Sequence, residues 1–157
     1  MKTERERAQQ SVAENRKAFH DFHILETFEA GVVLLGTEVK SIREGNVNLR
    51  DSFARVEGGE IWVYNIHVTP YSHRGYSDHE PTRRRKLLLH RSEIRKLIGK
   101  TVERGMTLVP TRMYFRNGQV KIAIGLAKGK KAHDKRETIK RRETDRETRA
   151  AMKERRR

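Results

Sequence analysis

Apolar and polar residues alternate along much of the middle of the chain, a pattern typical of half-buried β-strands. Residues 62–68 carry a large apolar side chain at every second position. The pair Gly58-Gly59 lies shortly before them and predicts a hairpin with residues 53–56. A short apolar run at 86–90 predicts a buried strand, and residues 19–28 predict an earlier one. The pattern therefore indicates a mainly β protein.

A second hairpin is predicted where residues 108–116 and 119–127 flank the dipeptide Asn117-Gly118. This dipeptide suits a two-residue type I′ turn, because both central positions of that turn need a positive φ. The apolar residues of the second strand recur at period two and are expected to face the interior, with Lys121 facing outward: Val120, Ile122, Ile124 and Leu126.

Two short helices are predicted between the strands. Thr37 is suited to cap a helix over residues 38–44, with Gly45 as its stop. Ser92 is suited to cap a second helix, which has one apolar stripe and ends at Gly99. About six strands with small helices at the corners predict an OB-fold-like, closed six-stranded antiparallel barrel.

The distribution of apolar residues divides the chain into three parts. Residues 1–14 are polar and charged and are expected to be flexible. Residues 15–127 contain nearly all the large apolar side chains and are expected to form the barrel. Residues 128–157 form a tail with 14 Lys and Arg and 6 Asp and Glu, a net charge of +8. Because such a tail cannot offset its ordering entropy by burial, it is predicted to be disordered when the protein is free.

The whole chain is strongly basic, with 36 Lys and Arg against 21 Asp and Glu and a net charge of +15. RNA, DNA and an anionic membrane are candidate partners for such a surplus, and the clustering of the charge favours RNA. The chain has no cysteine, which excludes disulfides and thiolate zinc sites. It has no apolar run that could span a bilayer and no signal peptide. We therefore expect a monomeric cytoplasmic protein with no membrane partner.

Three groups of basic residues are candidate phosphate contacts. Arg16 and Lys17 follow Asn15 before the first predicted strand, and Lys40 and Arg43 lie one helical turn apart. The third group is the basic run 83–86, which leads into a strand. Charges on a rigid framework can match phosphates at fixed spacing and release counterions. Any one of these residues is equally well explained as an ordinary solvated side chain.

Aromatic residues and histidines are the remaining candidates for stacking, metal binding and catalysis. Strand aromatics can stack on bases, but the alternation favours a core position for Phe53, Trp62, Tyr64 and Phe115. The seven histidines lack the spacing of a zinc site, and no phosphate loop or nucleophile elbow is present. The sequence therefore predicts no catalytic residue, no metal site and no cofactor.

The motifs of this chain resemble those of one family, small protein B, the SsrA-binding protein and partner of transfer-messenger RNA. The resemblance covers about residues 15–142, with the motifs in the family's order and spacing. The matching stretches are Asn15-Arg16-Lys17-Ala18, Phe28-Glu29-Ala30-Gly31, Gly36-Thr37-Glu38-Val39-Lys40-Ser41-Ile42-Arg43, Asn48-Leu49-Arg50-Asp51-Ser52, Arg85-Lys86-Leu87-Leu88-Leu89-His90, Gly125-Leu126-Ala127-Lys128-Gly129-Lys130-Lys131 and His133-Asp134-Lys135-Arg136.

The resemblance implies an OB-fold barrel that binds the tRNA-like domain of transfer-messenger RNA in trans-translation, the rescue of stalled ribosomes. Asn15, Glu29 and Leu88 match positions tied to that binding, although a core role is equally natural for Leu88. Phe19 and Phe53 depart from the family, which often has a basic residue and a tyrosine there. With the basic candidates, the predicted RNA-binding residues are Asn15, Arg16, Lys17, Glu29, Lys40, Arg43, Lys86 and Leu88.

The resemblance also implies a role for the tail, which in this family enters the decoding region of the small ribosomal subunit and the empty messenger channel. We expect the tail to be helical there, although composition alone equally fits a floppy basic tail. The residues that match the family at this site are Gly129, Lys130, Lys131, His133, Asp134, Lys135 and Arg136.

The predicted function is delivery of transfer-messenger RNA to stalled ribosomes, with the RNA and the ribosome as partners. One rival is an OB-fold protein that binds ribosomal RNA alone. The other is a basic nuclease that uses the scattered histidines and acids.

Overall fold

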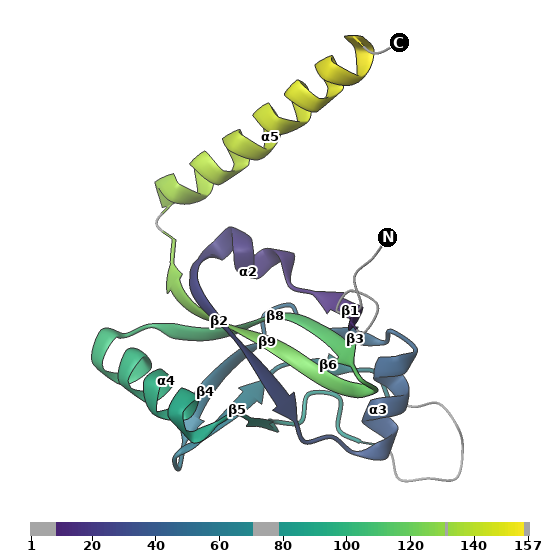
Figure 1. The fold of residues 1–157 in the computed structure, drawn as a ribbon, viewed down its shortest axis with the longest axis vertical. Helices are drawn as coiled ribbons and strands as arrows, with labels where there is room; N and C mark the ends of the chain where they lie inside the picture. Colours follow the sequence, from purple (N-terminus) through teal and green to yellow (C-terminus); the bar gives the residue numbers. More distant parts are fainter. Residues whose placement is uncertain (1–8, 71–78, 131, 156–157) are drawn as a thin grey trace.

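The computed structural model describes residues 9–70, 79–130 and 132–155. Within these ranges the strands form two antiparallel sheets, and helices lie between and after them along the chain (Figure 1). The large sheet contains β1 (Gln9–Glu14), β2 (Phe22–Val32), β4 (Phe53–Glu57), β5 (Glu60–Tyr64), β7 (Arg85–Leu88), β8 (Thr107–Arg116) and β9 (Gln119–Gly129). The small sheet pairs β3 (Val47–Asn48) with β6 (His67–Val68), and the helices are α2 (Arg16–Asp21), α3 (Gly36–Arg43), α4 (Arg91–Arg104) and α5 (Ala132–Arg155).

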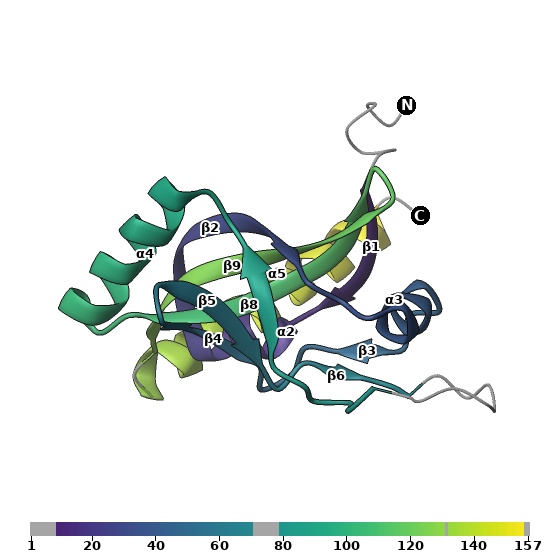
Figure 2. The same ribbon diagram turned by 90° about the horizontal axis from the view of Figure 1, so that it is seen from below.

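The large sheet closes on itself. Its strand order is β1-β8-β4-β5-β7-β2-β9, and β8 pairs with β9 as well as with β4. Six strands in the described ranges therefore form a ring of pairings, and β1 is added to β8 outside it (Figure 2). The expectation of a mainly β fold with short helices is confirmed. The interior is filled by apolar side chains, among them Ile42, Leu49, Ile61, Leu87, Leu97, Leu108, Met113, Ile122 and Ile124.

Both predicted hairpins are present. Asn117 and Gly118 have φ values of 51° and 76°, as a type I′ turn between β8 and β9 requires. Gly58 and Gly59 have φ values of 59° and 76° and join β4 to β5. The four residues predicted to face the interior from β9 are all buried. Local turn chemistry and period-two alternation therefore identified these elements correctly.

The inward face of β5 is the opposite of the one predicted. Ile61 and Val63 are buried, whereas Trp62 and Tyr64 are half-buried on the outer face. Asn65 has a φ of 62°, and beyond it Ile66 and Val68 are buried. A left-handed residue thus changes the phase of the alternation partway along the run.

The predicted core position of the aromatic residues is correspondingly wrong for most of them. Phe53 pairs with Tyr64 in the register of β4 and β5 and shares the outer face with it and with Trp62. Phe115 is half-buried and does pack against the core. The aromatic side chains of the β4–β5 hairpin are therefore available at the surface.

The start of the chain is more ordered than predicted. Residues 9–14 of the segment expected to be flexible form β1, which pairs with β8 because Val12 and Ala13 pack against the core. The first eight residues lie outside the described part of the chain. The strand predicted over 19–28 begins only at Phe22, because α2 occupies residues 16–21.

The ends of the helices depend on contacts that the sequence pattern did not reveal. The N–H of Leu35 donates to the carboxylate of Glu38 at 2.8 Å, so α3 begins before the predicted cap at Thr37. Gly45, with a φ of 79°, follows α3 as predicted. The prediction that the second helix ends at Gly99 is wrong, because α4 continues to Gly105, whose φ is 63°.

The tail forms a helix, α5, that extends away from the ring (Figure 1). Its described side chains, such as Arg142 and Met152, are exposed, and none of these forms a buried apolar face. Lys130, just before the helix, ties it to α2. Its backbone N–H donates to the carbonyl of Asp21 at 2.9 Å, and its Nζ donates to the carbonyl of Phe19 at 3.0 Å. Disorder of the tail in the free protein stays a prediction, motivated by this lack of burial.

Candidate nucleic-acid interface

Glu29 lies at the centre of a polar cluster on the outer face of β2, β8 and β9. The hydroxyl of Tyr114 donates to its carboxylate at 2.5 Å, and Arg116 Nη1 donates to both oxygens at 3.0 and 3.1 Å. The hydrogen bond from Tyr114, together with Arg116, holds the pKa of Glu29 below its usual range. The side chain remains 34% exposed. Glu29 is therefore a fixed, charged acceptor at the surface.

Tyr114 connects this carboxylate to a shallow pocket beside it. Burial and the hydrogen bond to Glu29 raise the pKa of Tyr114 to about 12, so the hydroxyl stays a donor at neutral pH. The guanidinium of Arg112 lies 4.8 Å from the centre of the tyrosine ring. The pocket has a volume of about 450 Å³, and its lining includes Phe19 and Thr27. Aromatic and basic groups beside hydrogen-bonding groups are the chemistry that recognises unstacked RNA bases.

Asn15, predicted to bind RNA, is instead a buried residue that holds three segments together. Its side chain is 3% exposed and donates to the carbonyls of Leu49 at 3.1 Å and Pro110 at 2.9 Å. Its Oδ1 accepts from the N–H of Ala18 at 3.2 Å and so caps α2. A direct contact with RNA is not open to this side chain. Its effect on binding would pass through the position of α2.

The basic candidates beside Asn15 do lie at the surface. Arg16 is exposed on α2, and Lys17 pairs with Asp51 at 2.6 Å. Phe19, which stands where the family often has a basic residue, is 47% exposed on the same helix. The first turns of α2 thus offer one cation, one cation already paired, and an aromatic ring.

The α3 candidates lie beside a different hollow. Lys40 and Arg43 are both exposed, on the side of α3 away from the buried Glu38. Arg43 lines a groove of about 680 Å³ between the end of α3, β1 and the β8–β9 turn, together with Gln10 and Asn117. The structure does not place Lys40 and Arg43 in the Glu29 cluster.

Leu88 and Lys86 share the outer face of β7 but have different neighbours. Leu88 is 53% exposed, so the alternative of a core position is wrong, and the core position belongs to Leu87. It packs over Gly31 of β2, where a Cβ atom would lie 3.3 Å from the Leu88 Cβ. Lys86 pairs instead with Trp62 of β5 in the strand register and lies 3.7 Å from Glu60. Leu88 therefore extends the β2 surface, whereas Lys86 belongs to the β5 side.

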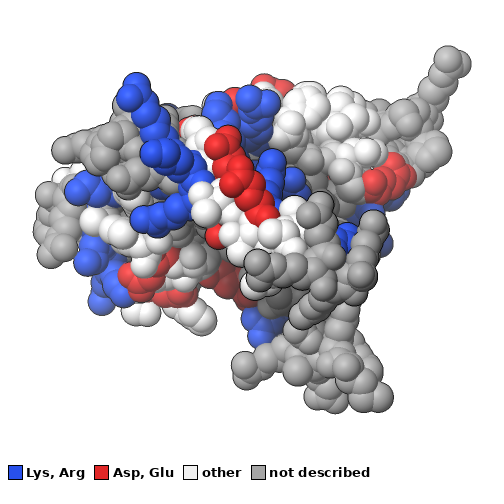
Figure 3. All heavy atoms as spheres, turned by 90° about the horizontal axis from the view of Figure 1, so that it is seen from above, with Lys and Arg blue, Asp and Glu red and all other residues white. Residues whose placement is uncertain are grey.

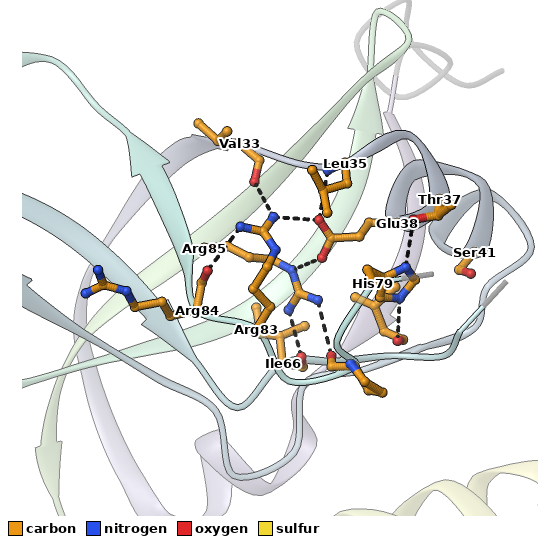
Figure 4. A network of polar contacts seen from close by, with 12 residues as sticks. Val33, Leu35, Thr37, Glu38, Ser41, Ile66, His79, Arg83, Arg84 and Arg85 are labelled. Carbon is orange, nitrogen blue, oxygen red and sulfur yellow. Dashed lines mark hydrogen bonds and ion pairs between the residues drawn. The ribbon is translucent and has the colours of Figure 1, made fainter. Parts of the chain in front are cut away.

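The basic run 83–86 contains a structural ion pair that sequence reasoning missed. Arg85 is buried and donates to Glu38 and to the carbonyl of Ile66 at 2.8 Å, while Arg83 donates to Glu38 at 2.6 Å (Figure 4). Burial alone would raise the pKa of Glu38, but Arg83, Leu35 N–H and Arg85 outweigh it and lower the pKa. This network fixes α3 against β7. Arg85 is therefore not a phosphate contact.

The tail candidates follow directly from β9. Gly129 is the last residue of the strand, and Lys130 is tied to α2 as described above. Lys131 and the side chains of His133, Asp134 and Lys135 lie outside the described part, while Arg136 is exposed in α5. Seen from above, the surface has Lys and Arg side chains grouped beside a narrow line of acidic ones (Figure 3).

No group of three or more His, Asp or Glu side chains in 9–70, 79–130 and 132–155 could hold a metal ion. None of the helices in these ranges is both long enough and apolar enough to cross a bilayer.

Comparison with known proteins gives consistent matches along nearly the whole chain. The model of the SmpB protein family matches residues 12–154. The SsrA-binding protein of Carboxydothermus hydrogenoformans is 58% identical over 144 residues, which cover 92% of this chain and 97% of that protein. The SsrA-binding protein of Thermosynechococcus vestitus is 56% identical over 145 residues, which cover 92% of this chain and 95% of that protein. A solved chain described as "tmRNA-SmpB: a journey to the center of the bacterial ribosome" has a TM-score of 0.64 and 52% identity, covering 76% of this chain and 85% of that one.

Proposed function

The chain belongs to the SmpB protein family, and on that basis we propose that it is an RNA-binding protein of trans-translation and not an enzyme. Its partners are then transfer-messenger RNA and the ribosome, both named for the similar solved complex. Working with ribosomes, it would act in the cytoplasm. The observation that carries the proposal is the Glu29 cluster, a fixed carboxylate surrounded by Tyr114 and Arg116 on the outside of a rigid sheet.

The ring of strands is the part that would hold the RNA. We regard it as an OB-fold-like barrel, a fold that binds oligonucleotides through its outer surface and loops. A carboxylate cannot attract phosphate, but it can accept hydrogen bonds from base or ribose donors. Phosphates would then be contacted by exposed cations, among them Arg116 beside Glu29 and Arg16 on α2. The β2, β8 and β9 face thereby recognises a folded, tRNA-like RNA.

The tail is the part that would sense the ribosome. Helix α5 projects from the ring with its described side chains exposed, so the basic residues among them are free of the barrel surface. We propose that it enters the vacant decoding site and messenger channel, where RNA phosphates stabilise a helix that has no apolar face of its own. A channel that still holds message would exclude it. The ring would thus bind the transfer-messenger RNA, and residues 129–157 would detect the empty messenger channel.

Deletion of residues 129–157 tests the division directly, because it removes α5 and only the last residue of β9. Binding to a tRNA-like transcript should change little, and rescue of stalled ribosomes in a reconstituted translation system should be lost. Loss of both activities in a folded truncated protein would contradict the two-part design. The rival that binds ribosomal RNA alone predicts no preference for the tRNA-like transcript over ribosomal RNA fragments.

A further inference from the structure

A second group of aromatic and basic side chains covers the outer face of the β4–β5 hairpin. Phe53 and Tyr64 pair across the strands, and their rings stack with centroids 5.3 Å apart and planes within 10°. Trp62 pairs with Arg55 in the same register. We call Phe53, Arg55, Trp62, Tyr64 and Arg84 the outer aromatic face. Its rings are half-buried, because Ile61 and Val63 fill the interior instead.

An arginine guanidinium lies over the Trp62 ring, and another lies over the Tyr64 ring. The Cζ of Arg84 lies 4.2 Å from the centre of the Trp62 ring, and the Cζ of Arg55 lies 4.5 Å from that of Tyr64. The two arginine side chains nevertheless remain 53% and 59% exposed. Each guanidinium therefore covers a ring with one side and leaves its other side open to solvent.

One carboxylate holds both arginines in place. Glu57 accepts from Arg55 Nε at 2.7 Å, from Arg84 Nη1 at 2.9 Å, and from the hydroxyl of Tyr64. These hydrogen bonds fix the planes of the two guanidinium groups before any partner arrives. A fixed planar cation loses little entropy when a second planar group stacks on it.

The outer aromatic face and the Glu29 cluster lie on different strands of the ring. In the order β8-β4-β5-β7-β2-β9, β7 separates the β4–β5 hairpin from β2. β8 pairs with β4 through Leu108, six residues before Tyr114 of the Glu29 cluster. The two surfaces are therefore separate patches of the ring. A partner on the β4–β5 side is a separate event from the RNA contact proposed above.

We propose that the outer aromatic face binds unpaired RNA nucleotides, whose bases stack on the exposed planes of Arg84 and Arg55. Bases stack on arginine planes and aromatic rings without strong sequence preference. Lys86, beside Trp62, lies within the same surface for a phosphate contact. Glu57 and Glu60 offset much of the positive charge here, so stacking rather than net charge carries the interaction. The proposal goes beyond the function assigned to the Glu29 side and does not depend on it.

The chain contains a single tryptophan, which makes Trp62 a built-in probe. The intact protein is titrated with an unstructured RNA oligonucleotide while tryptophan fluorescence is recorded. We expect saturable quenching, and about tenfold weaker binding for Arg84→Gln, the size of one lost stacking contact. Arg95→Gln removes the same charge from an exposed site on α4 and should leave the affinity unchanged. No quenching, or equal weakening by the two variants, would overturn the proposal.

Further variants separate stacking from folding and from the other surface. Trp62→Phe keeps an aromatic ring under Arg84 and should retain most of the affinity measured with labelled RNA, whereas Trp62→Leu should lose it. Trp62→Leu should still bind a tRNA-like transcript. Glu29→Gln should lose binding to that transcript but retain binding to the oligonucleotide. If Glu29→Gln kept both RNAs, the proposed function would fail while this inference stood. Quenching by a polyglutamate peptide as strong as that by RNA would instead overturn the assignment to RNA.

Discussion

Replacement of Asn15 by alanine distinguishes a residue that contacts RNA from one that positions α2. The alanine variant loses the helix cap on Ala18, worth about 1 kcal/mol. It also leaves the buried carbonyls of Leu49 and Pro110 without this donor, at roughly 1 kcal/mol each. We therefore expect the free energy of unfolding to fall by about 3 kcal/mol, the upper part of the range for single substitutions.

Urea denaturation followed by circular dichroism measures this loss. The dependence of the free energy of unfolding on urea concentration should be unchanged if the fold is kept. Asn15→Asp is the matched variant, because it retains the acceptor for Ala18 but points a carboxylate oxygen at two carbonyls. It should destabilise at least as much as alanine. Should Asn15→Ala keep the parent's stability to within about 0.5 kcal/mol and still lose RNA binding, direct contact would be established and our reasoning refuted.

The remaining predictions concern the buried ion pair, the Glu29 cluster and the tail. Glu38→Gln should reduce the free energy of unfolding by about 3–5 kcal/mol in urea denaturation, because it leaves the charge of buried Arg85 without its partner; an unchanged midpoint would contradict this. Because the pKa of Glu29 lies below its ordinary 4.5, its contribution to stability is complete above pH 4.5 and lost as the pH falls below it. Tyr114→Phe should raise that pKa toward 4.5, which an NMR titration of the carboxyl carbon measures, and an unmoved pKa would rule out the hydrogen bond. Alanine at residues 134–136 should spare recruitment to stalled ribosomes more than peptide tagging, and normal tagging would count against a decoding role.

The elements that the sequence predicted well are those set by local chemistry. The Asn117-Gly118 turn demands a positive φ, and the β9 strand has polar or small residues between its large apolar ones, so only one phase fits. In β5 both alternating sets are apolar, since Ile61 and Val63 are as suited to a core as Trp62 and Tyr64. Which of the two faces of β5 turns inward depends on strands far away in the chain, so the period of the pattern alone does not predict it.

The candidate site was predicted in part for the same reason. Glu29 and Leu88 came from the family motif, and both lie at the surface as a binding role requires. Asn15 came from the same motif, but its burial depends on carbonyls 34 and 95 residues away. Arg85 belongs to an unbroken basic run, and nothing in that run distinguishes the one arginine that meets Glu38. Such roles exist only once the ring has closed.

We propose that the rigid ring recognises a folded RNA by shape, with charge as a secondary contribution. The most direct measurement is a salt titration that compares binding to a tRNA-like transcript with binding to an unstructured RNA of equal length. Both affinities should fall as salt rises, because the release of counterions on binding becomes less favourable, but the preference for the tRNA-like transcript should persist at every concentration. Convergence of the two affinities at high salt would show that the basic surface alone holds the RNA.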